Sequence, residues 1–145
     1  MSETRQLKIR AQLGEINRIE SFVESFCLKF RIYDEYFGII IHSLSEVMRK
    51  IIKQNNPDGY IQITQYHEKN KVRYVITSPD GLDLNLKFDE NNPTDIAVNK
   101  LIDDCELEKS QIVITYNIKS IHYTEWIRRK NLLYEYEQKT AKKAK

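Results

Sequence analysis

The side chains that could do chemistry are few and lie far apart in the sequence. His42, His67 and His122 fall in separate segments without the spacing of a metal site, so core or solvent-facing histidines are the simpler interpretation. Cys27 and Cys105 lack CxxC spacing and lie in apolar segments, which favours buried free thiols. The serines lack the glycines of a nucleophile elbow, and neither a Walker loop nor a dinucleotide-binding glycine motif is present.

The strongest element is a long amphipathic helix that we predict over residues 34–53. Asp34 is its candidate N-cap, and Asn55-Asn56-Pro57 is a typical end for it. Its apolar side chains recur at spacings of three and four, which places them on one broad stripe. They are Phe37, Ile40, Ile41, Leu44, Val47, Met48, Ile51 and Ile52.

The rest of the chain alternates between strand and helix patterns. Period-two alternation indicates strands, and apolar spacings of three and four indicate helices. The predicted elements are a strand at 4–12, a helix at 15–30, strands at 60–66 and 72–77, a short strand within 82–92, a helix from a cap at Asn92 or Thr94 to Asp103, strands at 105–108 and 111–118, and a terminal helix at 121–140.

This order predicts an α+β two-layer sandwich. Three helices are expected to cover one face of a mixed, mostly antiparallel sheet, because each helix has a single apolar stripe to bury. We divide the chain into a domain at residues 1–118 and a C-terminal helical extension at residues 119–145.

Composition and charge narrow the class of protein. The chain has 145 residues, 41% hydrophobic and 30% charged, which is ordinary for a globular domain. The net charge of +2 does not demand a nucleic-acid partner. No segment has the length of a membrane span or the pattern of a signal peptide, so we expect a cytoplasmic protein without membrane contact.

The run Ser45-Glu46-Val47-Met48-Arg49-Lys50-Ile51-Ile52-Lys53-Gln54-Asn55-Asn56 resembles the helix that opens the nucleotide site of GHKL (Bergerat-fold) ATPases. The likeness is to the small serine kinases that act as anti-sigma factors. The resemblance implies that Glu46 stands at the position of the base that activates a hydroxyl. It places Lys50 where the family has the asparagine that holds magnesium, and Gln54 where the family has histidine.

Lys50 has two interpretations. An ammonium group offers donors and no acceptor, so it does not ligate a cation. Lys50 follows Glu46 by four residues, the favoured spacing for a helical ion pair. The pair either occupies the former metal position or is an ordinary surface pair, and the sequence leaves both open.

Two further family motifs are altered. The resemblance sets Thr77 at the adenine-binding aspartate and Gly81 at a glycine of the same loop, although Gly81 is more simply a turn glycine. The glycine-rich lid that should precede the third helix is replaced by Asp89-Glu90-Asn91-Asn92-Pro93-Thr94-Asp95, whose acids oppose a triphosphate. We therefore expect that neither ATP nor magnesium binds, and that no cofactor or metal is required.

The extension at 119–145 combines large apolar side chains with basic residues. Residues 126–145 carry seven basic against two acidic side chains, a net charge of +5 that leaves −3 on the rest. A solvated end is the simpler interpretation of this charge. The helix either packs back on its own domain, the simpler expectation, or presents an apolar strip to a partner through Trp126, Ile127, Leu133 and Tyr136.

The favoured hypothesis is a non-catalytic regulatory or scaffold protein that acts through protein–protein contacts. Its partner would be a sigma factor or an antagonist of the anti-sigma type, with a homodimer left open. The first alternative is an ATP-binding serine/threonine kinase-type anti-sigma factor with an unconventional site. The second is nucleic-acid binding through the basic tail, which we consider the weaker alternative because the net charge is small.

Overall fold

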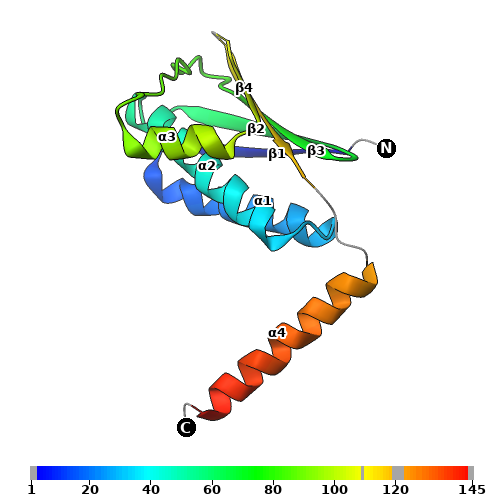
Figure 1. Ribbon diagram of the computed structural model, residues 1–145. Helices are drawn as coiled ribbons and strands as arrows, with labels where there is room; N and C mark the ends of the chain where they lie inside the picture. Colours follow the sequence, from blue (N-terminus) through cyan, green and yellow to red (C-terminus); the bar gives the residue numbers. More distant parts are fainter. Residues whose placement is uncertain (1–2, 109, 119–122, 144–145) are drawn as a thin grey trace.

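The computed structural model describes residues 3–108, 110–118 and 123–143. Its centre is one five-stranded sheet with the strand order β1-β2-β3-β5-β4 (Figure 1). The strands are β1 (Glu3–Arg10), β2 (Tyr60–Glu68), β3 (Lys71–Thr77), β4 (Asp104–Leu107) and β5 (Gln111–Asn117).

The sheet is antiparallel at each of the strand pairings that the structure describes, rather than mixed as we expected. Between β1 and β2 the chain runs through two successive helices, so it re-enters the sheet in the reverse direction. The register aligns Ile63 with Ile76 and Ile76 with Ile112. These side chains are fully buried and form a row in the core beneath the helices.

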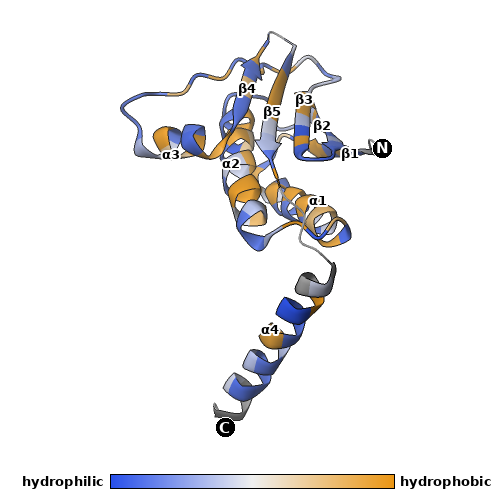
Figure 2. Ribbon diagram, turned by 45° about the vertical axis from the view of Figure 1, so that its right-hand side comes forward, coloured by the Kyte–Doolittle hydropathy of each residue, from blue (hydrophilic) through white to orange (hydrophobic). Residues whose placement is uncertain are grey.

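Three helices cover one face of the sheet, as predicted (Figure 1). They are α1 (Ile16–Lys29), which follows the short 3-10 turn η1 (Leu13–Glu15), α2 (Asp34–Lys53) and α3 (Pro93–Leu101). Hydrophobic residues on α1 and α2 face the sheet, and their outer sides are largely polar (Figure 2). The predicted α+β two-layer architecture is confirmed.

The joint between α1 and α2 is tight. Arg31 adopts a positive φ of 54°, and the backbone N–H of Ile32 donates to the carbonyl of Cys27 at 3.0 Å. This is the pattern of a Schellman cap, in which a left-handed residue ends a helix. The chain then extends at Tyr33, so α2 is capped by Tyr33 without a side-chain hydrogen bond. Asp34 is the first helical residue, and its prediction as the N-cap was wrong.

The segment 82–92 was predicted to contain a short strand, and this is wrong. It runs from β3 to α3 without sheet pairing. The side chain of Asn92 caps α3 by accepting from the N–H groups of Thr94 and Asp95, which confirms Asn92 rather than Thr94 as the cap. Helix α3 ends at Leu101, two residues before the predicted end, because Ile102 is extended and leads into β4.

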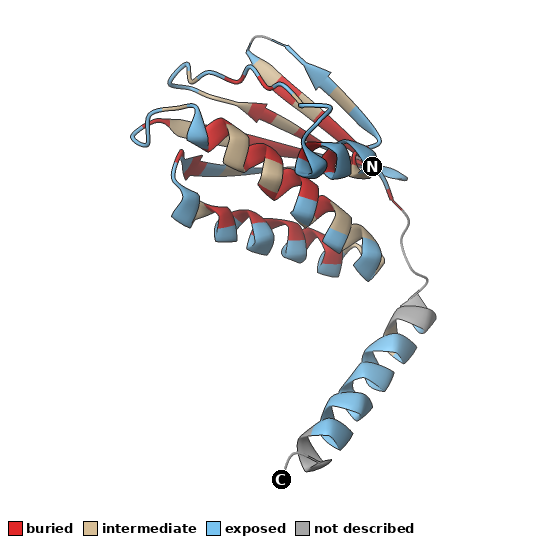
Figure 3. Ribbon diagram, turned by 60° about the vertical axis from the view of Figure 1, so that its left-hand side comes forward, coloured by how far each residue is buried: buried red, intermediate tan, exposed pale blue. Residues whose placement is uncertain are grey.

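The extension forms α4 (Tyr123–Lys143), which projects away from the sheet and its three helices (Figures 1 and 3). Leu132 and Leu133 on α4 are about half exposed, and Tyr134 and Tyr136 more so. The expectation that this helix packs along its own domain is therefore wrong for the described part of α4. Among its large side chains, Leu133 borders a cavity with Leu28 and Phe37 of the domain, whereas Tyr134 and Tyr136 are exposed.

Candidate functional site

The C-terminal half of α2 carries the residues that the sequence placed at a former nucleotide site. Lys50 lies there and faces α3. Its Nζ is 2.8 Å from Oδ1 and 2.8 Å from Oδ2 of Asp95, and 3.4 Å from the carbonyl oxygen of Lys87. The ammonium thus has three acceptors from outside α2, at the position where the resemblance places a metal-holding asparagine.

Asp95 is the buried member of this pair. Its side chain is 3% exposed, whereas that of Lys50 is 30% exposed. Burial raises the pKa of the Asp95 carboxyl, but the hydrogen bond from Lys50, the backbone N–H of Asp89 and the charge of Lys50 outweigh burial and lower that pKa below its usual value. The carboxylate is therefore ionised at neutral pH and binds the α3 N-terminus to α2.

Gln54 and Asn55 continue this contact at the end of α2. The Gln54 Nε2 donates to the carbonyls of Asp83 at 2.9 Å and Asn85 at 3.3 Å. Asn55 pairs with the backbone of Asp83 in both directions, donating from Nδ2 to the carbonyl and accepting from the N–H, each at 2.7 Å. Side-chain amides thus replace the sheet partners that the segment 82–92 lacks.

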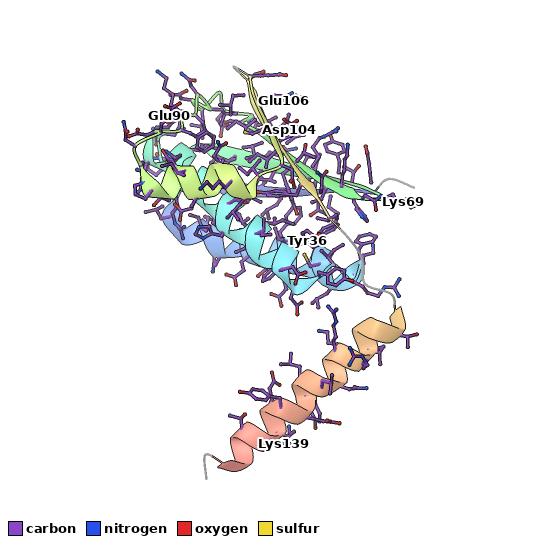
Figure 4. The ribbon with its side chains drawn as sticks, viewed as in Figure 1. Tyr36, Lys69, Glu90, Asp104, Glu106 and Lys139 are labelled. Atoms are coloured by element: carbon purple, nitrogen blue, oxygen red, sulfur yellow. The ribbon has the colours of Figure 1, made fainter. Side chains whose placement is uncertain are left out.

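The segment 82–92 is also fixed by apolar contacts. Leu84 and Leu86 are buried in the main core, at 2% and 3% exposure, and Phe88 packs against that core. The Nζ of Lys50 lies 5.9 Å from the centroid of the Phe88 ring. Hydrogen bonds from Lys50, Gln54 and Asn55, together with the buried leucines, therefore hold this segment against α2. Glu90 lies near its far end, in the loop before α3 (Figure 4).

Thr77 and Gly81 do not join this cluster. Thr77 follows the buried Ile76 in β3 and is therefore directed to the opposite face of the sheet, away from the helices. Gly81 has a φ of 70° and its N–H donates to the carbonyl of Ser78 at 3.3 Å. A Cβ at Gly81 would meet no atom within 4 Å, so this glycine serves the turn.

Glu46 is paired with Arg49, one turn along α2, and not with Lys50 as we expected. Lys50 instead pairs with the carboxylate of Asp95, which is more deeply buried than that of Glu46. Among the described residues, no other cationic side chain lies within hydrogen-bonding distance of Asp95. Arg49 also lines a cavity of about 540 Å³ between α1 and α2. Glu46 therefore belongs to the α1–α2 side of the helix rather than to the Lys50 cluster.

Asp95 was missed by the sequence reasoning, although a signal was present. It lies three residues before Val98, which is buried, and so occupies the apolar side of its helix. An acid on such a stripe needs a cation or several donors. A second polar contact in the core, between Ser43 Oγ and Tyr116 Oη at 2.6 Å, likewise joins elements distant in sequence.

The residues predicted for partner binding lie on α4. The Trp126 side chain is outside the part of the chain that the structure describes, and Ile127 is half-buried. Leu133 borders a cavity of about 360 Å³ together with Leu28 and Phe37 of the domain. Tyr136 is 68% exposed. The helix therefore does not cover the Lys50 cluster.

Metal and membrane sites find no support in the described residues. Within residues 3–108, 110–118 and 123–143, no three His, Cys, Asp or Glu side chains are grouped to hold a metal ion. No helix of this described part is both long enough and apolar enough to cross a membrane.

Cys27 and Cys105 are free thiols. Burial raises the pKa of each thiol, and that of Cys27 rises to about 12.

Comparison with known proteins shows a likeness of fold. No protein-family model matches the chain, and no curated protein matches it. Among solved structures, the chain is similar to the RsbU and RsbW domains of a Mycobacterium tuberculosis protein, with a TM-score of 0.59 and 10% identity. The match covers 80% of this chain and 32% of that one, so the chain spans about a third of the length of that structure.

Proposed function

We propose that this chain is a non-catalytic regulatory or scaffold protein, built on a fold like that of the anti-sigma-factor kinases, that acts through protein–protein contacts. The likeness to the structure with an RsbW domain supports the fold. The family's ATP and magnesium chemistry does not follow from the fold, because function depends on the side chains of the site.

The observation that carries the proposal is the ion pair between Lys50 and Asp95. At the position expected to hold magnesium, a cation is already present and is bound by a buried carboxylate. A magnesium ion placed there would be repelled by the ammonium and would need oxygen ligands that Lys50 does not offer. The segment 82–92, tied to Gln54 and Asn55, takes the place of an open lid.

Isothermal titration with ATP and magnesium tests the loss of nucleotide binding. We expect no saturable heat up to millimolar ATP, because Lys50 is already paired with Asp95 and the acids of the loop before α3 oppose a triphosphate. Saturable micromolar binding that Glu46→Ala abolishes would support the alternative, an ATP-binding serine/threonine kinase-type anti-sigma factor. Glu68→Ala, an exposed change at the end of β2, is the matched control for removal of a glutamate.

The partner surface that we propose lies between η1, α1 and α2. A cavity of about 540 Å³ there is lined by Leu13, Ile41, His42 and Arg49, among others, and Leu13 is 54% exposed. Such an exposed leucine beside a polar rim is typical of protein contact sites. The resemblance implies a sigma factor or an antagonist of the anti-sigma type as the partner.

Affinity capture from native lysate tests this surface. We expect a specific protein to be retained by the full chain and reduced at least tenfold by Leu13→Asp, because a carboxylate would be buried against the partner. Lys71→Glu on the sheet is the control and should retain capture. Absence of any specific partner, with the full chain and with residues 1–118, would contradict the proposal.

A further inference from the structure

Strand β1 lies at one edge of the sheet, and among the described residues it pairs with β2 alone. The N–H of Ala11 donates to the carbonyl of Gly59, which stands opposite it in the same register, so the odd-numbered residues of β1 bond to β2. The backbone N–H and carbonyl groups of the even-numbered residues therefore face away from the sheet. These residues are Thr4, Gln6, Lys8 and Arg10.

The chain itself occupies one end of this outer edge. The N–H of Arg10 donates to Oε1 of Glu15 at 3.3 Å, and its carbonyl accepts from the N–H of Gln12 at 2.8 Å. The rest of the edge is formed by Thr4, Gln6 and Lys8, which are exposed. Each of these residues offers one backbone donor and one acceptor, so the edge is a template for a strand from another molecule.

A groove between β1 and α1 borders this edge. Its volume is about 350 Å³, and its apolar walls include Leu7 and Phe22. The guanidinium of Arg5 lies 4.9 Å from the centre of the Phe22 ring and adds a positive charge to the groove. Glu20 and Glu24 of α1 instead line cavities shared with α2, so the groove lies on the side of α1 that faces away from α2.

The surroundings of the edge are basic. Four cationic side chains lie on β1 and the first turn of α1, and they are Arg5, Lys8, Arg10 and Arg18. Arg18 pairs with Glu15 at 3.5 Å. Of the side chains that the structure describes, no carboxylate forms an ion pair with the other three. The edge and its groove therefore suit a partner with acidic side chains.

We propose that the free edge of β1 binds an extended peptide segment of a partner protein, with acidic side chains that alternate with apolar ones. The segment adds to the sheet as an antiparallel strand, like the strands already present. In that arrangement the partner residues that bond to Gln6 and Lys8 direct their side chains to the open face of the sheet, beside the Lys8 ammonium. The residues between them lie over the groove at Leu7 and Phe22.

The charges disfavour two other arrangements. A second copy of β1 would bring its own lysine and arginines against those of the first, because like edges meet about a two-fold axis. The opposite edge of the sheet, β4, is only four residues long and carries Asp104 and Glu106, which repel an acidic segment. This inference goes beyond the proposed surface between η1, α1 and α2, and it requires neither that surface nor the loss of ATP binding.

Fluorescence anisotropy with a synthetic peptide tests the site. The probe is an end-blocked, dye-labelled peptide in which four glutamates alternate with four valines. We expect the full chain to bind it with a Kd of about 10–100 µM. Binding should weaken several-fold as salt rises from about 50 to 500 mM, because the charges are exposed. The same peptide with lysine in place of glutamate should bind at least tenfold more weakly.

Two variants with matched controls locate the binding to β1. Gln6→Pro removes an outward N–H without breaking a bond to β2, and we expect at least a tenfold loss of peptide affinity. Leu107→Pro is its control, because the N–H of Glu108 bonds to Gln111 and that of Leu107 therefore faces out from the opposite edge. Circular dichroism verifies that both chains are folded.

A charge reversal keeps the backbone of the edge intact. Lys8→Glu should weaken binding at least fivefold, because it places a carboxylate beside the glutamates of the probe. Lys100→Glu, an exposed change on α3, is the control and should leave binding unchanged. This pair decides the proposal if Gln6→Pro fails to fold.

Methylated probes test the orientation of the added strand. N-methylation of the four glutamates removes the N–H groups that face β1 in an antiparallel arrangement, and should weaken binding at least tenfold. N-methylation of the four valines removes the N–H groups on the far side, and should change binding less than about threefold. The reverse result would mean a parallel strand, and equal results would exclude strand addition; either would overturn the proposal.

Amide hydrogen exchange measured by NMR gives a direct readout of the edge. Saturating peptide should slow exchange of the outward N–H groups of Gln6 and Lys8 at least tenfold. The N–H groups of Leu7 and Ile9 already bond to β2 and should change little.

Several results would overturn the proposal. They are a probe that does not bind at 1 mM chain, equal binding of the lysine probe, binding that survives both Gln6→Pro and Lys8→Glu, and unchanged exchange at Gln6 and Lys8. Self-association of the wild type that Gln6→Pro abolishes, seen by sedimentation without peptide, would assign the edge to a second copy instead. None of these results bears on the loss of ATP binding or on capture through Leu13.

Discussion

The carboxylate of Asp95 connects three parts of the molecule at the scale of a single residue. It accepts from Lys50 on α2 and from the backbone N–H of Asp89 in the segment 82–92, while its own backbone belongs to α3. Ion pairs of this kind stabilise little relative to apolar packing, but the loss of one partner is costly because it strands a buried charge.

Replacement of Lys50 measures that cost. Lys50→Met keeps the length of the side chain and leaves the buried Asp95 carboxylate with the Asp89 N–H but without a cation. We expect a loss of about 3 kcal/mol in the free energy of unfolding. Urea denaturation at pH 7 measures it, with Lys71→Met as the exposed control, expected within about 0.5 kcal/mol of wild type. Equal effects of the two changes would contradict the assigned role of Lys50.

Acid should weaken the same contact. The folded-state pKa of Asp95 lies below 3.8, the ordinary pKa of an aspartate side chain, so folding favours the ionised carboxylate. The stabilisation is complete above pH 3.8 and is lost as the pH falls through the lower folded-state pKa. Asp95→Asn should therefore lower stability at neutral pH and flatten its decline in acid, measured by denaturation from pH 7 to pH 2. If the free energy of unfolding declines in acid as steeply in Asp95→Asn as in the wild type, other carboxylates cause that decline.

At the scale of elements, the joint between α1 and α2 places a residue with a Cβ in a left-handed backbone conformation that favours glycine. Arg31 holds φ at 54°, a conformation that costs a side chain with a Cβ about 1 kcal/mol. Arg31→Gly should remove this cost and raise the unfolding temperature by about 2–4 °C. Arg31→Ala keeps the strain and serves as the control in the same thermal scan. A lower unfolding temperature for Arg31→Gly would mean that contacts of the arginine side chain outweigh the strain.

The elements were more predictable from the sequence than the contacts between them. Helix 34–53 was predicted close to its observed bounds, with an error only at its cap, because its apolar spacing and the Asn-Asn-Pro stop are local signals. The alternation of Leu82, Leu84 and Leu86 indicated a strand, but it fits any extended segment with one buried side. Its backbone partners are Gln54 and Asn55, which lie on a different element.

The candidate site was only partly predictable for the same reason. Lys50 and Gln54 were identified on α2, yet the partner of Lys50 lies 45 residues away. Glu46 was the better candidate for the ion-pair partner of Lys50 by its spacing along the helix. Lys50 pairs with Asp95 instead, whose carboxylate is buried and needs a cation. Thr77 was placed by counting along a motif, whereas the pleat of β3 turns it to the other face of the sheet.

At the scale of the whole molecule, the charges on the sheet edges oppose association of two copies through like edges. The outward-facing side chains of the edge strand β1 include Lys8 and Arg10, and those of the opposite edge strand β4 are Asp104 and Glu106 (Figure 4). Pairing two β1 edges or two β4 edges would place like charges together.

Removal of residues 119–145 tests how far the domain depends on helix α4. Apart from its contact at Tyr33, where Arg129 lies 4.9 Å from the ring, and Leu133 at the cavity, described side chains of α4 are mostly exposed. The free energy of unfolding of residues 1–118 should therefore stay within about 1 kcal/mol of the full chain. Urea denaturation of both chains at the same protein concentration makes this comparison. A loss above about 3 kcal/mol would mean that the contacts of α4 with its own domain contribute substantially to the stability of the fold.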